Sequence, residues 1–149
     1  MKLFQIEEPE GSPVDAAEGS GAAVGIDLAP GGVGRVAIAI GGNGEILPDA
    51  DGERTLRAES GRTQALLLGL RSRAEKQLAR PVTHAVIAAD IAERAGLEAA
   101  AIEAGLTILR VMERRVAAAL VKGAAAEEAA ALGAAVAAED AMPDQSQLG

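Results

Sequence analysis

A chain of 149 residues is long enough for one domain with a buried core, and it contains no cysteine, which excludes disulfides, thiolate zinc sites and cysteine-held iron–sulfur clusters. The net charge of −8 argues against a general nucleic-acid binder. Alanine is the commonest of the apolar residues, and Phe4 is the one aromatic side chain. Because these side chains are small, we expect thin core layers with helices packed closely on a sheet.

The two ends of the chain differ in composition from its middle. Residues 1–22 mix acids, glycine, serine and proline, which predicts a flexible acidic head, and residues 143–149 predict a polar tail. Residues 23–142 are expected to form a single domain. The start is acidic and no apolar run approaches 18 residues, so we expect no secretory signal, no membrane association and a cytoplasmic location.

The first part of the expected domain predicts three strands joined by short turns. "AAVGIDLA" at 22–29 reads as a buried strand, and "GRVAIAIGG" at 34–42 as a second. The glycine-rich turn between them is short enough for a hairpin. A third, shorter strand is expected within "GEILPDADG" at 44–52. Together they predict an antiparallel meander.

Helices and strands alternate over the rest of the chain. Apolar residues three or four apart indicate helices, and continuous apolar runs indicate strands. The helix over 91–104 is expected to bury one face, formed by Ile91, Ala95, Ala99 and Ile102. In chain order we expect a helix at 62–79, a strand at 82–89, a helix at 91–104, a strand at 106–112, and helices at 114–123 and 126–142.

This order of elements restricts the topology. After the meander, strands that alternate with helices require right-handed parallel crossovers. We therefore expect an α/β domain with a mixed five-stranded sheet in the order 3-2-1-4-5 and helices packed on it, a ribonuclease H-like layout. Functional groups in such sheets gather at the carboxyl ends of the parallel strands, which places Asp27 and Asp90 side by side.

Several segments, in the same order, resemble the ATPase domain of the DnaK-type heat-shock chaperones. "VGIDL", a glycine-containing turn and "VAIA" are similar to the first phosphate loop of that family, and "VTHAVIAAD" and "EAAAIEAGLTILRVMERRVAAALVKG" continue the likeness. "EEAAALGAAVAAEDAM" resembles the helix that closes the nucleotide-binding domain. "LFQIEEPEGSP" and "GEILPDADGER" look most like HscA, the iron–sulfur assembly branch. The resemblance covers residues 3–57 and 64–142.

The resemblance implies only about half of an actin-like ATPase fold. After "AAALVKG" the chain passes almost directly to the closing helix, so the second phosphate loop, the second lobe and the substrate-binding domain have no counterpart. The family likeness also implies a nucleotide site. In it, Asp27 would organise magnesium through water, and ATP or ADP would contact Asp27, Gly31, Gly32, Gly34 and Gly133.

The chain departs from the family at the catalytic positions. The family turn Gly-Thr-Thr-Asn reads "APGGVG" here, in which Ala29 adds a Cβ and Pro30 removes an amide donor. The family's catalytic glutamate aligns with Arg114. Altered phosphate donors cost transition-state stabilisation, so we expect no efficient ATP hydrolysis. If the chain has catalytic residues, Asp27 and Asp90 are the candidates. The sequence does not indicate what either would do in a reaction.

Three functions remain open from the sequence. The first is a protein-interaction or accessory module whose partner is a chaperone, an iron–sulfur assembly factor or a second copy of the chain. The second is residual binding of ATP or ADP with magnesium. The third is a ribonuclease H-like nuclease that holds two metals with Asp27, Asp90, Glu139 and Asp140. The acidic charge and the scarcity of aromatic residues argue against the third.

Overall fold

The structure is a computed structural model, and it describes residues 21–58 and 62–142. The expected tail at 143–149 and most of the expected head lie outside these residues. The expected head extends to residue 22, whereas the first strand, β1, already begins at Ala22. Within the described part, no helix is long and apolar enough to cross a membrane.

Six strands form one mixed sheet in the described part of the chain. Its main path runs β3-β2-β1-β5-β6, and β4 pairs with β2. Pairing is antiparallel from β3 through β1 and parallel from β1 through β6. The strands are β1 (Ala22–Ala29), β2 (Val33–Ile40), β3 (Asn43–Ile46), β4 (Leu56–Arg57), β5 (Val82–Ala89) and β6 (Thr107–Met112).

The α/β class and the mixed sheet are confirmed. The expected count of five strands is wrong, because β4 is inserted between the expected third and fourth strands, and the main path is therefore numbered β3-β2-β1-β5-β6 rather than 3-2-1-4-5. Leu56 and Arg57 of β4 pair with Gly34 and Val33 of β2. Two residues are too few to show the alternation by which a strand is recognised in a sequence. The expected third strand is also shorter, because the chain turns after Ile46.

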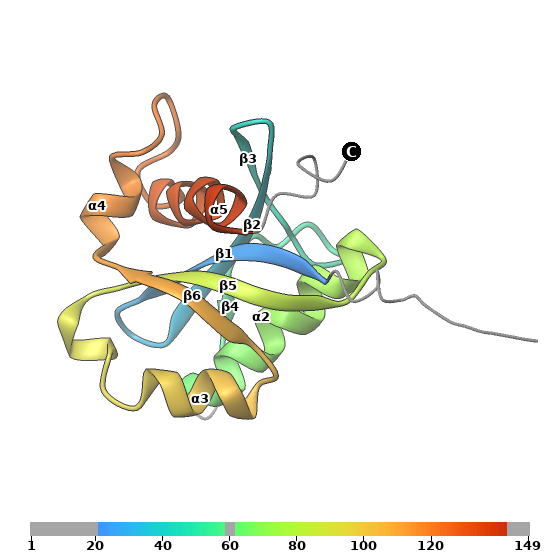
Figure 1. The fold of residues 1–149 in the computed structure, drawn as a ribbon, viewed down its shortest axis with the longest axis vertical. Coiled ribbons are helices and arrows are strands. Elements are labelled where there is room, and N and C mark those ends of the chain that lie inside the picture. Colours follow the sequence, from blue (N-terminus) through green and yellow to red (C-terminus); the bar gives the residue numbers. More distant parts are fainter. Residues whose placement is uncertain (1–20, 59–61, 143–149) are drawn as a thin grey trace, which may run out of the picture.

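Helices cover both faces of the sheet, as Figure 1 shows. α2 and α3 lie on one face, and α4 and α5 lie on the other. The largest buried cluster joins α2 and α3 to β1 and β5, while two smaller, alanine-rich clusters lie beneath α5. The helices are α2 (Thr63–Leu78), the 3₁₀ turn η2 (Ile91–Glu93), α3 (Leu97–Glu103), α4 (Arg114–Ala118) and α5 (Ala129–Ala141).

The continuous helix expected over 91–104 is wrong. η2 is separated from α3 by Gly96, whose φ of 70° lies in the left-handed region. The break shifts the phase of the apolar residues, so that Leu97 and Ala101 are buried. Ile91 and Ile102, expected in the core, are 74% and 69% exposed.

Successive residues of β1 point to opposite faces of the sheet. Ile26 and Leu28 belong to the cluster under α2 and α3. Gly25 faces α5, where an added Cβ would collide with the backbone of Ala134 and Ala135. Because glycine occupies this position, α5 can lie directly against β1. Asp27 follows on this same face, two residues closer to the end of the strand.

Candidate functional site

Asp27 lies at the carboxyl end of β1 and is completely buried. Its carboxylate accepts two hydrogen bonds from the guanidinium of Arg114, the first residue of α4. The Arg114 Nε–Asp27 Oδ1 distance is 2.7 Å and the Nη2–Oδ2 distance is 3.0 Å. Such a bidentate pair is the strong form of an arginine–carboxylate contact. The position expected to face magnesium therefore faces a cation of the chain itself.

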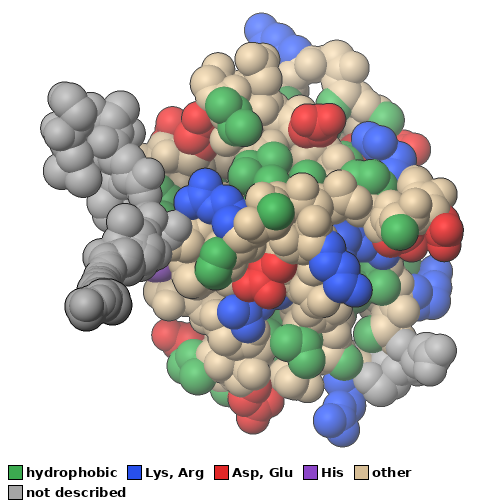
Figure 2. All heavy atoms as spheres, turned by 90° about the vertical axis from the view of Figure 1, so that its right-hand side faces the viewer, with side chains coloured by type: hydrophobic (Ala, Val, Ile, Leu, Met, Phe, Trp, Pro, Cys, Tyr) green, Lys and Arg blue, Asp and Glu red, His purple; other side chains and the backbone are tan. Residues whose placement is uncertain are grey.

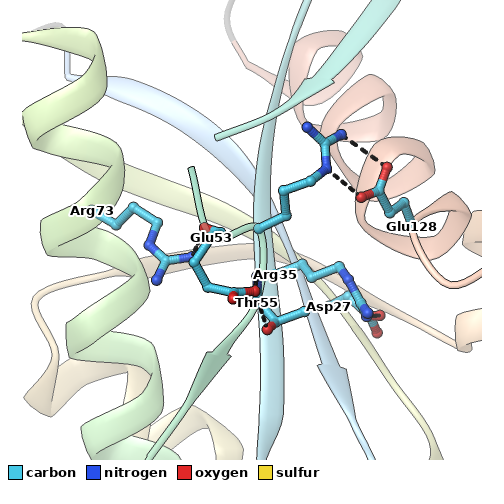
Figure 3. A network of polar contacts seen from close by, with 7 residues as sticks. Asp27, Arg35, Glu53, Thr55, Arg73 and Glu128 are labelled. Atoms are coloured by element: carbon cyan, nitrogen blue, oxygen red, sulfur yellow. Dashed lines mark hydrogen bonds and ion pairs between the residues drawn. The ribbon is translucent and has the colours of Figure 1, made fainter. Parts of the chain in front are cut away.

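A second guanidinium lies beside the same carboxylate. Arg35 pairs with Asp27 across β1 and β2, and its Nη1 lies 4.0 Å from Asp27 Oδ2 (Figure 3). The Nε of Arg35 is buried and has no hydrogen-bond partner within the described residues. Two arginines thus lie within 4.0 Å of one buried carboxylate.

Arg114 is held in its charged form by its surroundings. The hydrogen bond to Asp27 is the main cause that raises the pKa of Arg114, and the negative charges of Asp27, Asp90 and Glu93 raise it further, against the opposing effect of burial. The structure places Asp90 directly after β5, whose Ala88 is the register partner of Asp27. The two candidate carboxylates therefore lie at neighbouring strand ends, with Arg114 close to both.

The glycine-rich turn connects β1 to β2. Gly31 and Gly32 have φ angles of 86° and 77°, which side-chain-bearing residues rarely adopt. The carbonyl oxygen of Gly31 accepts a hydrogen bond of 3.0 Å from Arg57 Nη1 of β4. Gly34 lies in β2, where an added Cβ would come within 2.7 Å of Leu70 on α2. Hairpin geometry and helix packing thus account for these glycines without a bound phosphate.

Gly133 also has a packing role. It lies in α5, and a Cβ at this position would collide with the carbonyl oxygen of Ala117 in α4. The absence of a side chain lets the two helices cross in direct backbone contact. The contact positions α4, and therefore Arg114, over the end of β1.

The structure does not bring Glu139 to the other two carboxylates. Glu139 of α5 accepts hydrogen bonds from the backbone amides of Gly41 and Gly42, at 2.6 and 2.9 Å, in the turn after β2. This turn is at the opposite end of β2 from Arg35, about 20 Å away at 3.3 Å per residue. Asp140 is exposed. No group of three His, Cys, Asp or Glu side chains suited to a metal ion occurs among the described residues.

Sequence reasoning missed the partners of Asp27. The sequence did contain one indication of them. Asp27 lies within a strand expected to be buried, and a buried carboxylate needs a cation beside it. A scan of the chain against models of protein families finds no matching family, and a search of curated proteins finds no matching sequence. The geometry alone therefore supports a buried arginine–carboxylate centre at the carboxyl ends of the parallel strands.

Proposed function

We propose that this chain is a reduced relative of the DnaK-type chaperone ATPase domain, with a ribonuclease H-like fold, that does not hydrolyse ATP and acts by binding protein. Its partner is a chaperone or an iron–sulfur assembly factor in the cytoplasm. The observation that carries the proposal is the bidentate Asp27–Arg114 pair. It supports loss of phosphoryl transfer, because the same two positions hold magnesium and the catalytic glutamate in the family that the sequence resembles.

The energetics of the ion pair favour this reading over nucleotide binding. Removing one partner of a buried ion pair typically costs about 3–5 kcal/mol, because the other charge is left uncompensated. A magnesium ion approaching Asp27 would have to displace Arg114 and lie near Arg35. The like charges of these arginines and the metal oppose binding, so magnesium–nucleotide complexes are expected to bind weakly or not at all.

Exposed apolar side chains at the same end of the sheet as the ion pair support a protein partner. Ile91 follows β5 and is 74% exposed, and Val116 of α4 follows β6 and is 43% exposed. The two strands are parallel neighbours, with Ala88 paired to Met112, so both side chains lie at the same end of the sheet. Figure 2 shows the other end, where charged side chains of both signs are interspersed with small apolar areas.

Isothermal titration with ATP and with ADP, each with magnesium, tests the first half of the proposal. We expect no heat of binding at millimolar nucleotide for the natural chain or for Asp27→Ala. Binding at micromolar strength that Asp27→Ala abolishes would establish the competing function, a residual nucleotide-binding protein. Hydrolysis of the bound ATP would refute the non-hydrolysing assignment itself.

Titration against a purified DnaK-type chaperone and a purified iron–sulfur scaffold protein tests the second half. We expect saturable binding to one of them, weakened at least tenfold by Ile91→Asp. Ile40→Asp is the matched control, because Ile40 is 73% exposed at the far end of β2. Failure of both partners to bind would contradict the proposed partner class, and a mass that rises with concentration in sedimentation would then assign the surface to a second copy.

A further inference from the structure

A cavity of about 540 Å³ lies between α2 and the loop that joins β3 to β4. One wall is formed by α2, and the other by the loop residues that follow β3. The lining includes Pro48, Ala50, Asp51, Ser72, Arg73 and Lys76. None of the lining residues belongs to the Asp27–Arg114 centre or to the exposed apolar side chains beside it, so the cavity does not depend on the proposed function.

The loop wall is held in shape by its own hydrogen bonds. The Asp49 carboxylate accepts hydrogen bonds from the backbone amides of Asp51 and Glu53, at 2.8 and 2.9 Å. The amide of Glu53 is the main cause that lowers the pKa of Asp49, so this carboxyl is ionised at neutral pH. The side-chain amide of Gln77 donates a hydrogen bond of 2.9 Å to the carbonyl oxygen of Pro48, which ties the loop to α2. Both walls are therefore formed before a ligand arrives, as is usual for small-molecule sites.

Arg73 provides the cavity with unused donors. Its side chain is only 8% exposed, yet one of its five N–H groups donates within the described chain, from Nη1 to the carbonyl oxygen of Glu53 at 3.2 Å (Figure 3). Nη2 lies 3.8 Å from Asp49 Oδ2, beyond hydrogen-bond range, and Nε has no hydrogen-bond partner in the part of the chain that the structure describes. In that same part, the side-chain atoms that lack both a partner and solvent contact are Arg35 Nε and Glu93 Oε1. The free donors of Arg73 therefore keep contact with solvent, and Arg73 lines the cavity.

The charges of the two walls are opposite. Lys76 lies about one turn after Arg73 on α2 and adds a second cation to the helix wall. Asp49 and Asp51 place two carboxylates on the loop wall. A simple anion would be attracted by one wall and repelled by the other, whereas a molecule that carries both charges is complementary to both. The lining therefore favours a zwitterion whose carboxylate faces α2 and whose ammonium group faces the loop.

We propose that this cavity binds a free amino acid with an aliphatic side chain. Its carboxylate accepts hydrogen bonds from Arg73 and from the ammonium group of Lys76, and its own ammonium group pairs with Asp51. The aliphatic side chain lies against Pro48 and Ala50. At about 30 Å³ for each water-sized group, the cavity has room for roughly 18 such groups, which is enough for a whole amino acid rather than a single ion.

Titration of the full chain with L-leucine, followed by amide chemical shifts in NMR, tests the site. We expect saturating shifts at Ala50, Gly69 and Ser72, which line the cavity. Isopentylamine lacks the carboxylate of L-leucine and 4-methylpentanoate lacks its ammonium group, so each is expected to bind at least tenfold more weakly. Equal affinity for the three compounds, or shifts that do not saturate, would overturn the proposal.

Variants of the helix wall test which groups hold the amino acid. Arg73→Lys keeps the charge but loses the planar fork of donors, so it is expected to weaken L-leucine binding at least tenfold. Lys76→Gln removes an exposed charge and is expected to weaken it at least threefold, with Lys122→Gln, exposed and outside the cavity, as the control.

A further variant tests the location without changing a charge. Ser72 is exposed on α2, and leucine favours a helix over serine, so Ser72→Leu is expected to fold and to exclude the amino acid. Unchanged binding in Ser72→Leu or in Lys76→Gln would place the ligand elsewhere and overturn the proposal. An equal loss in Lys76→Gln and Lys122→Gln would overturn it as well, since it would show only a general charge effect.

Discussion

Asp27 has no contact with solvent, and its carboxylate depends on side chains from β2 and α4 for compensation. Arg114, which lies 87 positions further along the chain, donates both hydrogen bonds. Arg35 is farther away, at 4.0 Å, and contributes charge without a hydrogen bond to the carboxylate. The contact with Arg114 is therefore the one on which the buried charge depends most.

Arg114→Ala is expected to lower the free energy of unfolding by about 3–5 kcal/mol, because it leaves the Asp27 carboxylate buried without hydrogen bonds. Urea denaturation at neutral pH measures this loss. Arg115→Ala is the matched control: its side chain is 87% exposed and pairs with Glu113, so a change within about 0.5 kcal/mol is expected.

Adding Asp27→Asn to Arg114→Ala is expected to recover part of the stability, because the uncompensated charge is then removed. Equal stability of Arg114→Ala and the natural chain would show that Arg35 or water compensates the charge of Asp27. It would also remove the energetic argument that Arg114 keeps magnesium away from Asp27.

Contacts between residues far apart in the chain, such as Asp27 and Arg114, limit what the sequence could predict. β1 was predicted over its full length, because eight consecutive residues have the composition of a buried strand. The proximity of Asp27 and Asp90 followed from strand order alone. The role of Arg114 did not, because no local pattern records which distant side chain a buried carboxylate meets.

At the scale of elements, the errors have a similar cause. Apolar residues three or four apart predicted one helix over 91–104, but the left-handed backbone at Gly96 divides it and changes which residues are buried. Glu139 was grouped with Asp27 and Asp90 as a metal ligand because ribonuclease H-like nucleases use carboxylates on the first strand, at the end of the fourth strand and on the last helix. The hairpin turn that it contacts could be located only in three dimensions.

The contact between α4 and α5 depends on Gly133. Alanine favours a helix over glycine by about 1 kcal/mol, yet Gly133→Ala is expected to destabilise the protein by at least about 2 kcal/mol, because its Cβ would meet the backbone of Ala117. Gly69→Ala in α2 is the control. Its Cβ would meet only the movable side chain of Leu56, so thermal denaturation is expected to show a change within about 1 kcal/mol. Equal effects would contradict the close crossing.

Glu139 connects α5 to the turn between β2 and β3. Glu139→Gln is expected to destabilise the protein by about 1–2 kcal/mol, because it weakens two charge-assisted hydrogen bonds. Amide hydrogen exchange at Gly41 and Gly42 should accelerate, while exchange in β5 should change only as far as global stability falls. Asp140→Asn, at an exposed neighbouring position, should leave both unchanged; acceleration in that variant would indicate a general charge effect.

For the whole molecule, the Arg54–Glu128 pair links the segment before β4 to the start of α5 (Figure 3). The hydrogen bond from Arg54 is the main cause that lowers the pKa of Glu128 below its ordinary value of 4.5. A lowered pKa in the folded state means that the pair stabilises the fold above pH 4.5 and that this contribution is lost as the pH falls through the folded-state pKa.

Glu128→Gln should therefore be less stable than the natural chain at neutral pH, and the difference should narrow below pH 4.5. Urea midpoints across the acid range measure it. Because Arg54 is half exposed, added salt should reduce the difference at neutral pH. Glu127→Gln, an exposed neighbour, is the control, and a difference that stays constant with pH would show that Glu128 does not act through its charge.

The alanine surface of α5 has a consequence for how that helix is positioned. Methyl groups of equal height form few ridges, so they fix the distance of a helix from a sheet better than they fix its place along its own axis. Glu128 and Glu139 lie at the two ends of α5, about 16 Å apart, and each is bound to a different loop. These two carboxylates hold the two ends of α5, so polar contacts at the rim add to the close glycine contacts at Gly25 and Gly133 in fixing where the helix lies along its axis.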